Sequence, residues 1–189
     1  MRTDRPPPSP LDREALERMT LRYVGRYATT RAKLATYLRR KQRERGWHDS
    51  SLSAEAAVER MVQLCAERGY VDDRGFGEMR AASMARRGLG ARRVAATLRA
   101  DGLTPEDAAF LDEAIDARSV ASAVAFARRR RIGPFAADPA DRALRDKQIA
   151  AMVRAGHSFD MAREIVAMSP MSQIGEVAEI ERHLLLSLS

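Results

Sequence analysis

The chain has 189 residues, of which 45% are hydrophobic, only 5% aromatic and 31% charged, and its formal net charge is +7. That content is enough for one core or for a few small helical modules, and the positive charge favours a polyanionic or acidic partner. The single cysteine, Cys65, excludes an intramolecular disulfide framework and suits a reducing, cytoplasmic setting.

Residues 1–10 are proline-rich and polar and lack the apolar stretch of a secretory signal, so we expect a disordered lead-in. No later apolar run reaches the length of a membrane span, and we expect no membrane partner. Helical periodicity recurs between glycines, whereas no segment alternates with a period of two residues. The pattern predicts an all-α fold with helices near 11–26, 30–45, 53–68, 73–87, 90–101, 104–116, 118–131, 139–155 and 158–168. The tail, 170–189, is a candidate for one more helix over 173–187.

Three glycines occupy equivalent places in the chain. Gly46, Gly102 and Gly156 lie 56 and 54 residues apart; Gly102 and Gly156 are suited to the left-handed turn that ends a helix, and Gly46 opens a looser counterpart. Thr104 and Ser158 follow the second and third glycine as helix N-caps, and the first glycine has a longer turn before its cap. The spacing therefore predicts a repeated module.

The repeat divides the chain into three three-helix units, residues 11–68, 73–116 and 118–168. Units of this size bury little apolar surface alone, and stacking lets neighbours share a core. We therefore expect an elongated, curved tandem array of helix-turn-helix-like repeats, a shape that suits a long repetitive partner surface.

The search for catalytic and metal-binding groups favours structural interpretations. His48, His157 and His183 lack the close spacing of a helical metal pair, and His157 stands where a side chain packs after a helix-ending glycine. Cys65 lies on an apolar stripe, which favours a buried thiol over a nucleophile. We expect no enzyme activity, no cofactor and no metal site.

Two further patterns have both a structural and a functional interpretation. The carboxylates of Asp72–Asp73 could form an acid/base or metal site, but capping of the helix that starts near Arg74 is favoured. The stretch Gly88–Gly90 precedes a helix and resembles half of a phosphate cradle. It lacks the preceding strand and the following Lys-Ser/Thr of a P-loop, so it predicts no nucleotide site.

Charge is segregated along the chain. Residues 21–50 have a net charge of +7 and residues 81–100 of +5, whereas residues 101–120 have −5 and residues 158–189 have −3. An ordinary soluble protein surface has positive and negative side chains interspersed. Basic blocks of this kind therefore favour a surface that binds a polyanion or an acidic protein. The candidate binding residues are Arg31, Lys33, Arg39, Arg40, Arg86, Arg87, Arg92, Arg93, Arg99, Arg128, Arg129, Arg130 and Arg131.

Five segments, in order, resemble the RecX family of regulatory proteins. The central ones are Gly69–Phe76, with its Asp-Asp pair, and Arg86–Leu98, a basic-glycine stretch followed by an amphipathic helix. Leu21–Leu34 looks like the family's opening helix pair, and Ala127–Phe135 and Gly156–Asp160 look like its third repeat. The resemblance spans most of the chain.

The resemblance implies a modulator, mainly an inhibitor, of RecA. Family members bind RecA, lie in the groove of its filament on DNA, and interfere with strand exchange, ATP hydrolysis and stimulated repressor cleavage in DNA repair and the SOS response. The basic faces would then contact RecA, DNA phosphates or both, with weak non-specific DNA binding expected. We expect the protein itself to be a monomer.

The alternative is a stand-alone helix-turn-helix DNA-binding protein, with the helix over 90–101 as its recognition helix. That helix contains no Asn or Gln to read adenine edges, and Arg92 and Arg93 serve phosphates as readily as guanines. Sequence-specific recognition of a duplex is therefore disfavoured.

Overall fold

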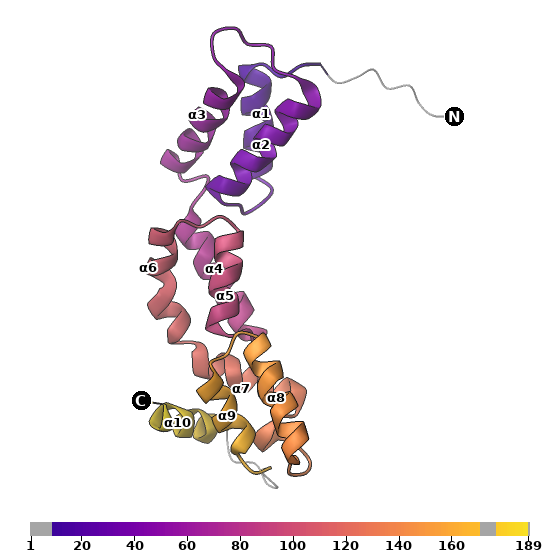
Figure 1. The fold of residues 1–189 in the computed structure, drawn as a ribbon. Coiled ribbons are helices and arrows are strands. Elements are labelled where there is room, and N and C mark those ends of the chain that lie inside the picture. The colour runs from indigo at the N-terminus through magenta and orange to yellow at the C-terminus, as the bar shows by residue number, and fades with distance from the viewer. Residues whose placement is uncertain (1–8, 171–176, 189) are drawn as a thin grey trace, which may run out of the picture. The chain divides into compact units, whose positions relative to one another are not determined.

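The computed structural model describes residues 9–170 and 177–188, and within them the chain is helical, without a β-strand (Figure 1). A single bridge pairs Leu11 with Trp47. The all-α prediction is confirmed, and every predicted helix is present. The helices are α1 (Arg13–Val24), α2 (Arg31–Arg45), α3 (Ala54–Glu67), α4 (Asp73–Arg86), α5 (Ala91–Ala100), α6 (Pro105–Asp116), α7 (Ser119–Arg130), the 3-10 turn η1 (Gly133–Phe135), α8 (Arg142–Arg154), α9 (Phe159–Ala167) and α10 (Val177–Ser187).

The predictions for the two ends fall partly outside the described residues. Residues 1–8 of the expected lead-in, and residues 171–176 and 189 of the tail, are among those not described. The carbonyl of Ser9 accepts two hydrogen bonds from the Arg45 guanidinium, at 2.9 and 2.6 Å. Among the described helices, none is long and apolar enough to cross a membrane.

Local chain chemistry accounts for where the repeated helices start. Thr104 and Ser158 each accept a hydrogen bond from the backbone N–H three residues on, as predicted for N-caps. Gly46, Gly102 and Gly156 have φ of 81°, 89° and 99°, the left-handed region that costs other residues energy. Positive φ is confirmed at all three glycines, but Gly46, with ψ of 165°, lies outside the left-handed helical conformation.

The chain forms two compact units, of which the first contains residues 1–76 and 101–103. Its core is built by the buried faces of α1, α2 and α3, with Leu16, Leu34, Leu38 and Val58 fully buried. The Trp47 side chain packs at the edge of this core. Its indole Nε1–H donates a hydrogen bond to the Leu52 carbonyl oxygen at 2.8 Å.

The second unit contains residues 77–100 and 104–189. One core cluster joins α7, α8, α9 and α10, with Met152, Ile165 and Leu184 fully buried. In α5, Val94 and Leu98 are buried at a spacing of four residues. Arg92, Arg93 and Arg99 of the same helix are exposed.

Candidate functional site

In the first unit, the basic candidates at the start of α2 are held by acidic residues from distant parts of the chain. The Asp73 carboxylate accepts from the backbone N–H of Arg31 at 2.8 Å and from its guanidinium Nε at 2.9 Å. The ammonium of Lys33 lies 2.6 Å from Asp101. Both acidic side chains are nearly buried, with 2% and 12% exposure. These two cations therefore have structural partners of their own.

Further along α2, the remaining candidates of the first unit also have acidic partners. The Arg39 guanidinium forms an ion pair with Glu55 of α3, which raises the pKa of Arg39 and lowers that of Glu55. Arg40 lies 3.8 Å from Glu44, which also receives the Lys41 ammonium at 2.6 Å. Since these pairs are exposed, each contributes little stability, but each offsets positive charge on this face.

The second unit brings three basic segments together at one junction. Arg86 closes α4 and Arg87 follows it, while Arg92 and Arg93 lie in the first turn of α5. The guanidinium of Arg129, near the end of α7, donates to the Arg87 carbonyl. Residues far apart in the chain thus gather around the turn between α4 and α5. We call this surface the arginine junction: Arg86, Arg87, Arg92, Arg93 and Arg128–Arg131.

The backbone beneath the arginine junction is tightly interlocked. The N–H of Gly90 donates to the Ala155 carbonyl at 2.9 Å, and the N–H of Arg92 donates to the Gly156 carbonyl at 3.1 Å. A Cβ added to Gly90 would lie 2.3 Å from the carbonyl carbon of Gly156. These amides already serve backbone carbonyls, so the turn from Gly88 to Gly90 is a packing element and not a phosphate cradle.

The arginines of this junction are exposed, and they lack the acidic partners that the four candidates on α2 have. Within residues 9–170 and 177–188, no carboxylate forms a salt bridge with any candidate of the second unit, Arg99 of α5 included. Unpaired guanidinium groups keep their capacity for carboxylates or phosphates of a partner. The structure thus separates the predicted residues into a paired set and an unpaired set.

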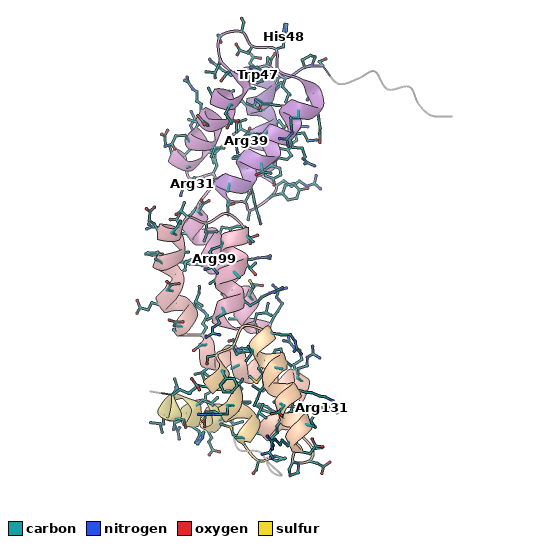
Figure 2. The ribbon with its side chains drawn as sticks, viewed as in Figure 1. Arg31, Arg39, Trp47, His48, Arg99 and Arg131 are labelled. Atoms are coloured by element: carbon teal, nitrogen blue, oxygen red, sulfur yellow. The ribbon has the colours of Figure 1, made fainter. Side chains whose placement is uncertain are left out.

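The end of α7 presents four consecutive arginines of the unpaired set. Cations in the last turn complement the negative end of the helix dipole. Arg131 terminates the helix with φ of 53°, and the guanidinium of Arg130 lies 5.9 Å from the ring centre of Phe126. Figure 2 labels Arg131 on this unit and Arg31 and Arg39 on the first. The four arginines thus stabilise the C-terminal end of α7 and also present positive charge to solvent.

Two titratable side chains have structural roles, as expected. His157 is 3% exposed, its Nε2 hydrogen-bonds the Gly88 carbonyl at 3.1 Å, and its ring meets Phe126 edge-on. Burial lowers the pKa of His157, so the neutral ring is favoured. Cys65 is 1% exposed, and burial raises the pKa of its thiol, which disfavours a nucleophilic thiolate.

Both residues of the Asp72–Asp73 pair lie at the start of α4, as predicted, but Asp73 also has a distant partner that was not predicted. Asp72 caps α4, accepting from the N–H of Gly75 at 3.0 Å. Asp73 instead holds Arg31, 42 residues away in the chain. No local sequence pattern predicts the contact between Asp73 and Arg31. Asp73 has the position of a carboxylate at a helix start, and Arg31 is one of many cations in a basic block. Over the described part of the chain, no group of three or more His, Cys, Asp or Glu side chains could hold a metal ion.

No protein-family profile matches the chain. Individual relatives do: a regulatory protein RecX from Myxococcus xanthus is 32% identical over 82% of this chain and 86% of its own length. A regulatory protein RecX from Halorhodospira halophila is 32% identical over 82% and 88%, and one from Agrobacterium fabrum is 30% identical over 74% and 75%.

The fold has a counterpart among solved structures. The crystal structure of RecX from Lactobacillus salivarius matches with a TM-score of 0.61 over 92% of this chain and 97% of that one, at 16% identity. At that identity the likeness concerns the fold, while the sequence relatives carry the assignment. The chain belongs to the RecX family of regulatory proteins.

Proposed function

We propose that this protein binds RecA and the RecA filament on DNA in the cytoplasm, and that it mainly inhibits the recombinase, ATPase and co-protease activities of RecA during DNA repair and the SOS response. Membership of the RecX family supports this proposal. It acts as a regulator and not as an enzyme, through surface contacts that change how the filament grows or turns over.

The observation that carries the proposal is the arginine junction. Its guanidinium groups are exposed and lack carboxylate partners within the described residues, whereas the four candidates on α2 (Arg31, Lys33, Arg39 and Arg40) each have one. An unpaired cluster of this kind attracts acidic protein surfaces and DNA phosphates over long range, and salt weakens the attraction. Among the predicted residues, those of the second unit are therefore the preferred contacts.

The three modules, residues 11–68, 73–116 and 118–168, would give the protein repeated contacts with a repetitive partner. Each contains a glycine turn with a confirmed left-handed φ. Modules joined in one chain raise the effective concentration of each successive contact, which strengthens binding without any single tight site. A filament of identical subunits is a partner with the matching repetition.

Co-sedimentation with RecA filaments tests the contact surface. The double variant Arg92→Glu/Arg93→Glu is compared with Arg60→Glu/Arg68→Glu, which changes the net charge equally at exposed positions of the first unit. We expect the first variant to bind at least about tenfold more weakly, a loss of about 1.4 kcal/mol, and the second to bind like the unmodified protein. Equal binding by both variants would show that the arginine junction does not contact the RecA filament.

A further inference from the structure

A groove between α1 and α2 of the first unit combines tyrosine rings with a rim of cations. It is separate from the arginine junction of the second unit. Its volume is about 610 Å³, within the range of ligand-binding clefts. We propose that this groove binds single-stranded nucleic acid, with bases on the tyrosines and phosphates on the arginines. The proposal does not depend on RecA, because it concerns binding by this protein alone.

The floor of the groove is aromatic. Tyr23 and Tyr37 stack with ring centres 4.0 Å apart and planes 14° apart, and Tyr27 packs at 5.3 Å on the Tyr23 side. Tyr27 is 50% exposed, so its ring is available to a ligand. Three of the four tyrosines in the chain gather here, although aromatic residues are scarce overall. Every nucleobase has a face that can stack on such rings, which makes binding tolerant of sequence.

The rim of the groove is cationic. Arg18, Arg22 and Arg26 recur every four residues along α1 and the turn that follows it, and Lys41 and Arg45 line the groove from α2. Residues four apart in a helix rise by roughly 6 Å, so the arginines form a ladder along one edge. A ladder of cations beside an aromatic floor follows a sugar-phosphate backbone while the bases turn inward.

The charge balance of the rim is positive even after internal pairs are counted. Glu44, the acidic residue that lines the groove, is held by Lys41 at 2.6 Å, and Arg18 pairs with Glu14 at 3.2 Å. Arg22 has no ion pair within the described residues, and the Arg26 guanidinium lies 5.5 Å from the ring centre of Tyr27. The guanidinium lies over one face of the Tyr27 ring, and its own flat outer face is a further surface on which a base can stack.

Other occupants fit less well. The chain's own residues 1–8 contain Arg2 and Arg5 against Asp4, so their charge has the same sign as the rim. A duplex keeps its bases stacked on each other and offers the tyrosines only phosphate and sugar, so it would use the cations alone. An acidic peptide would also use the cations but would not need three tyrosines. The groove therefore favours a single strand with accessible bases.

Fluorescence anisotropy with a labelled oligothymidine of about 12 nucleotides tests the proposal, because single-strand sites span about 4–16 nucleotides. The comparison probes are an abasic strand and a duplex of the same length. Tyr27→Ala is matched by Tyr70→Ala, since both side chains are 50% exposed. Arg22→Glu is matched by Arg60→Glu, since both residues are exposed and carry the same charge change. Circular dichroism checks that each variant is folded.

We expect the protein to prefer oligothymidine over the abasic strand and the duplex. Tyr27→Ala should weaken oligothymidine binding about fivefold or more and leave abasic-strand binding unchanged, because stacking alone is lost. Arg22→Glu should weaken both, and the two control variants should behave like the unmodified protein. Equal affinity for all probes, or no effect of Tyr27→Ala, would overturn the proposal. So would a polyglutamate peptide that binds in an Arg22-dependent way while oligothymidine binding is unaffected.

Discussion

Asp73 and Arg31 join the beginning of α4 to the beginning of α2 through two hydrogen bonds to one carboxylate, at 2.8 and 2.9 Å. The backbone N–H of Arg31 belongs to the first turn of α2, where such groups have no partner inside the helix. Beside it, the Thr30 hydroxyl donates to the Asp101 carbonyl at 2.7 Å and accepts from the N–H of Lys33. The start of α4 and the turn at Asp101 are thus both hydrogen-bonded to the start of α2.

Asp73→Asn tests this junction. The variant should lower the free energy of unfolding by about 1.5–3 kcal/mol, because a buried carboxylate that accepts two hydrogen bonds is replaced by an amide facing the same donors. Urea denaturation followed by circular dichroism measures the change. Asp72→Asn is the control, since asparagine caps a helix as well as aspartate does, and it should be close to neutral. An equal effect of the two substitutions would show that the Arg31 contact adds nothing.

Gly90→Ala tests the interlocked turn of the second unit. A Cβ there would lie 2.3 Å from a backbone atom of Gly156, so α5 or the turn before α9 must move. Overpacking of this kind costs about 1–3 kcal/mol. Gly25→Ala is the matched control, because Gly25 has a helical φ of −71° and its added Cβ would meet Leu21 O at 3.1 Å. Thermal unfolding of both variants should show a clear drop for Gly90→Ala alone.

The sequence was sufficient for features that depend on near neighbours. Thr104 and Ser158 were recognisable as caps and Gly102 as a left-handed turn, since each acts within a few residues of itself. The helical periodicity likewise predicted α5, in which the buried residues Val94 and Leu98 lie four positions apart. These elements fixed the all-α class before any tertiary contact was known.

The contacts between distant segments could not be predicted in this way. Arg31 and Lys33 looked like free surface cations, yet their partners, Asp73 and Asp101, come from other helices and turns. Neither acidic residue has a spacing that reveals the pair, because tertiary packing alone brings them together. The tyrosine groove was missed for a similar reason, although Arg18, Arg22 and Arg26 repeat every four residues and could have signalled a common face.

His157 should make stability depend on pH. Burial lowers its pKa below the ordinary 6.5, so the unfolded chain binds the proton more readily than the folded one. The stabilisation is fully present above pH 6.5 and is lost as the pH falls towards the folded-state pKa. His157→Gln keeps a donor for the Gly88 carbonyl but cannot titrate. Urea denaturation at pH 7.5 and 5.5 should show a smaller pH effect in the variant, and identical pH effects would show that His157 does not cause the pH dependence.

Cys65 should react slowly with a thiol reagent while the protein is folded. The side chain is 1% exposed and burial raises the pKa of its thiol, so both access and thiolate population are reduced. Labelling in the native state and in urea, followed spectroscopically, measures the ratio of rates. Fast native labelling would show that the core around α3 opens readily.

Regulation of RecA by this protein is tested by the single-strand-DNA-dependent ATPase activity of RecA, measured with substoichiometric amounts of the protein. We expect inhibition by the unmodified protein, and clearly weaker inhibition by Arg92→Glu/Arg93→Glu at unchanged helical content and melting temperature. Arg60→Glu/Arg68→Glu should inhibit like the unmodified protein. An ATPase rate that no form of the protein alters, together with tight and selective binding to one duplex sequence, would show that the protein is a stand-alone DNA-binding protein and not a regulator of RecA.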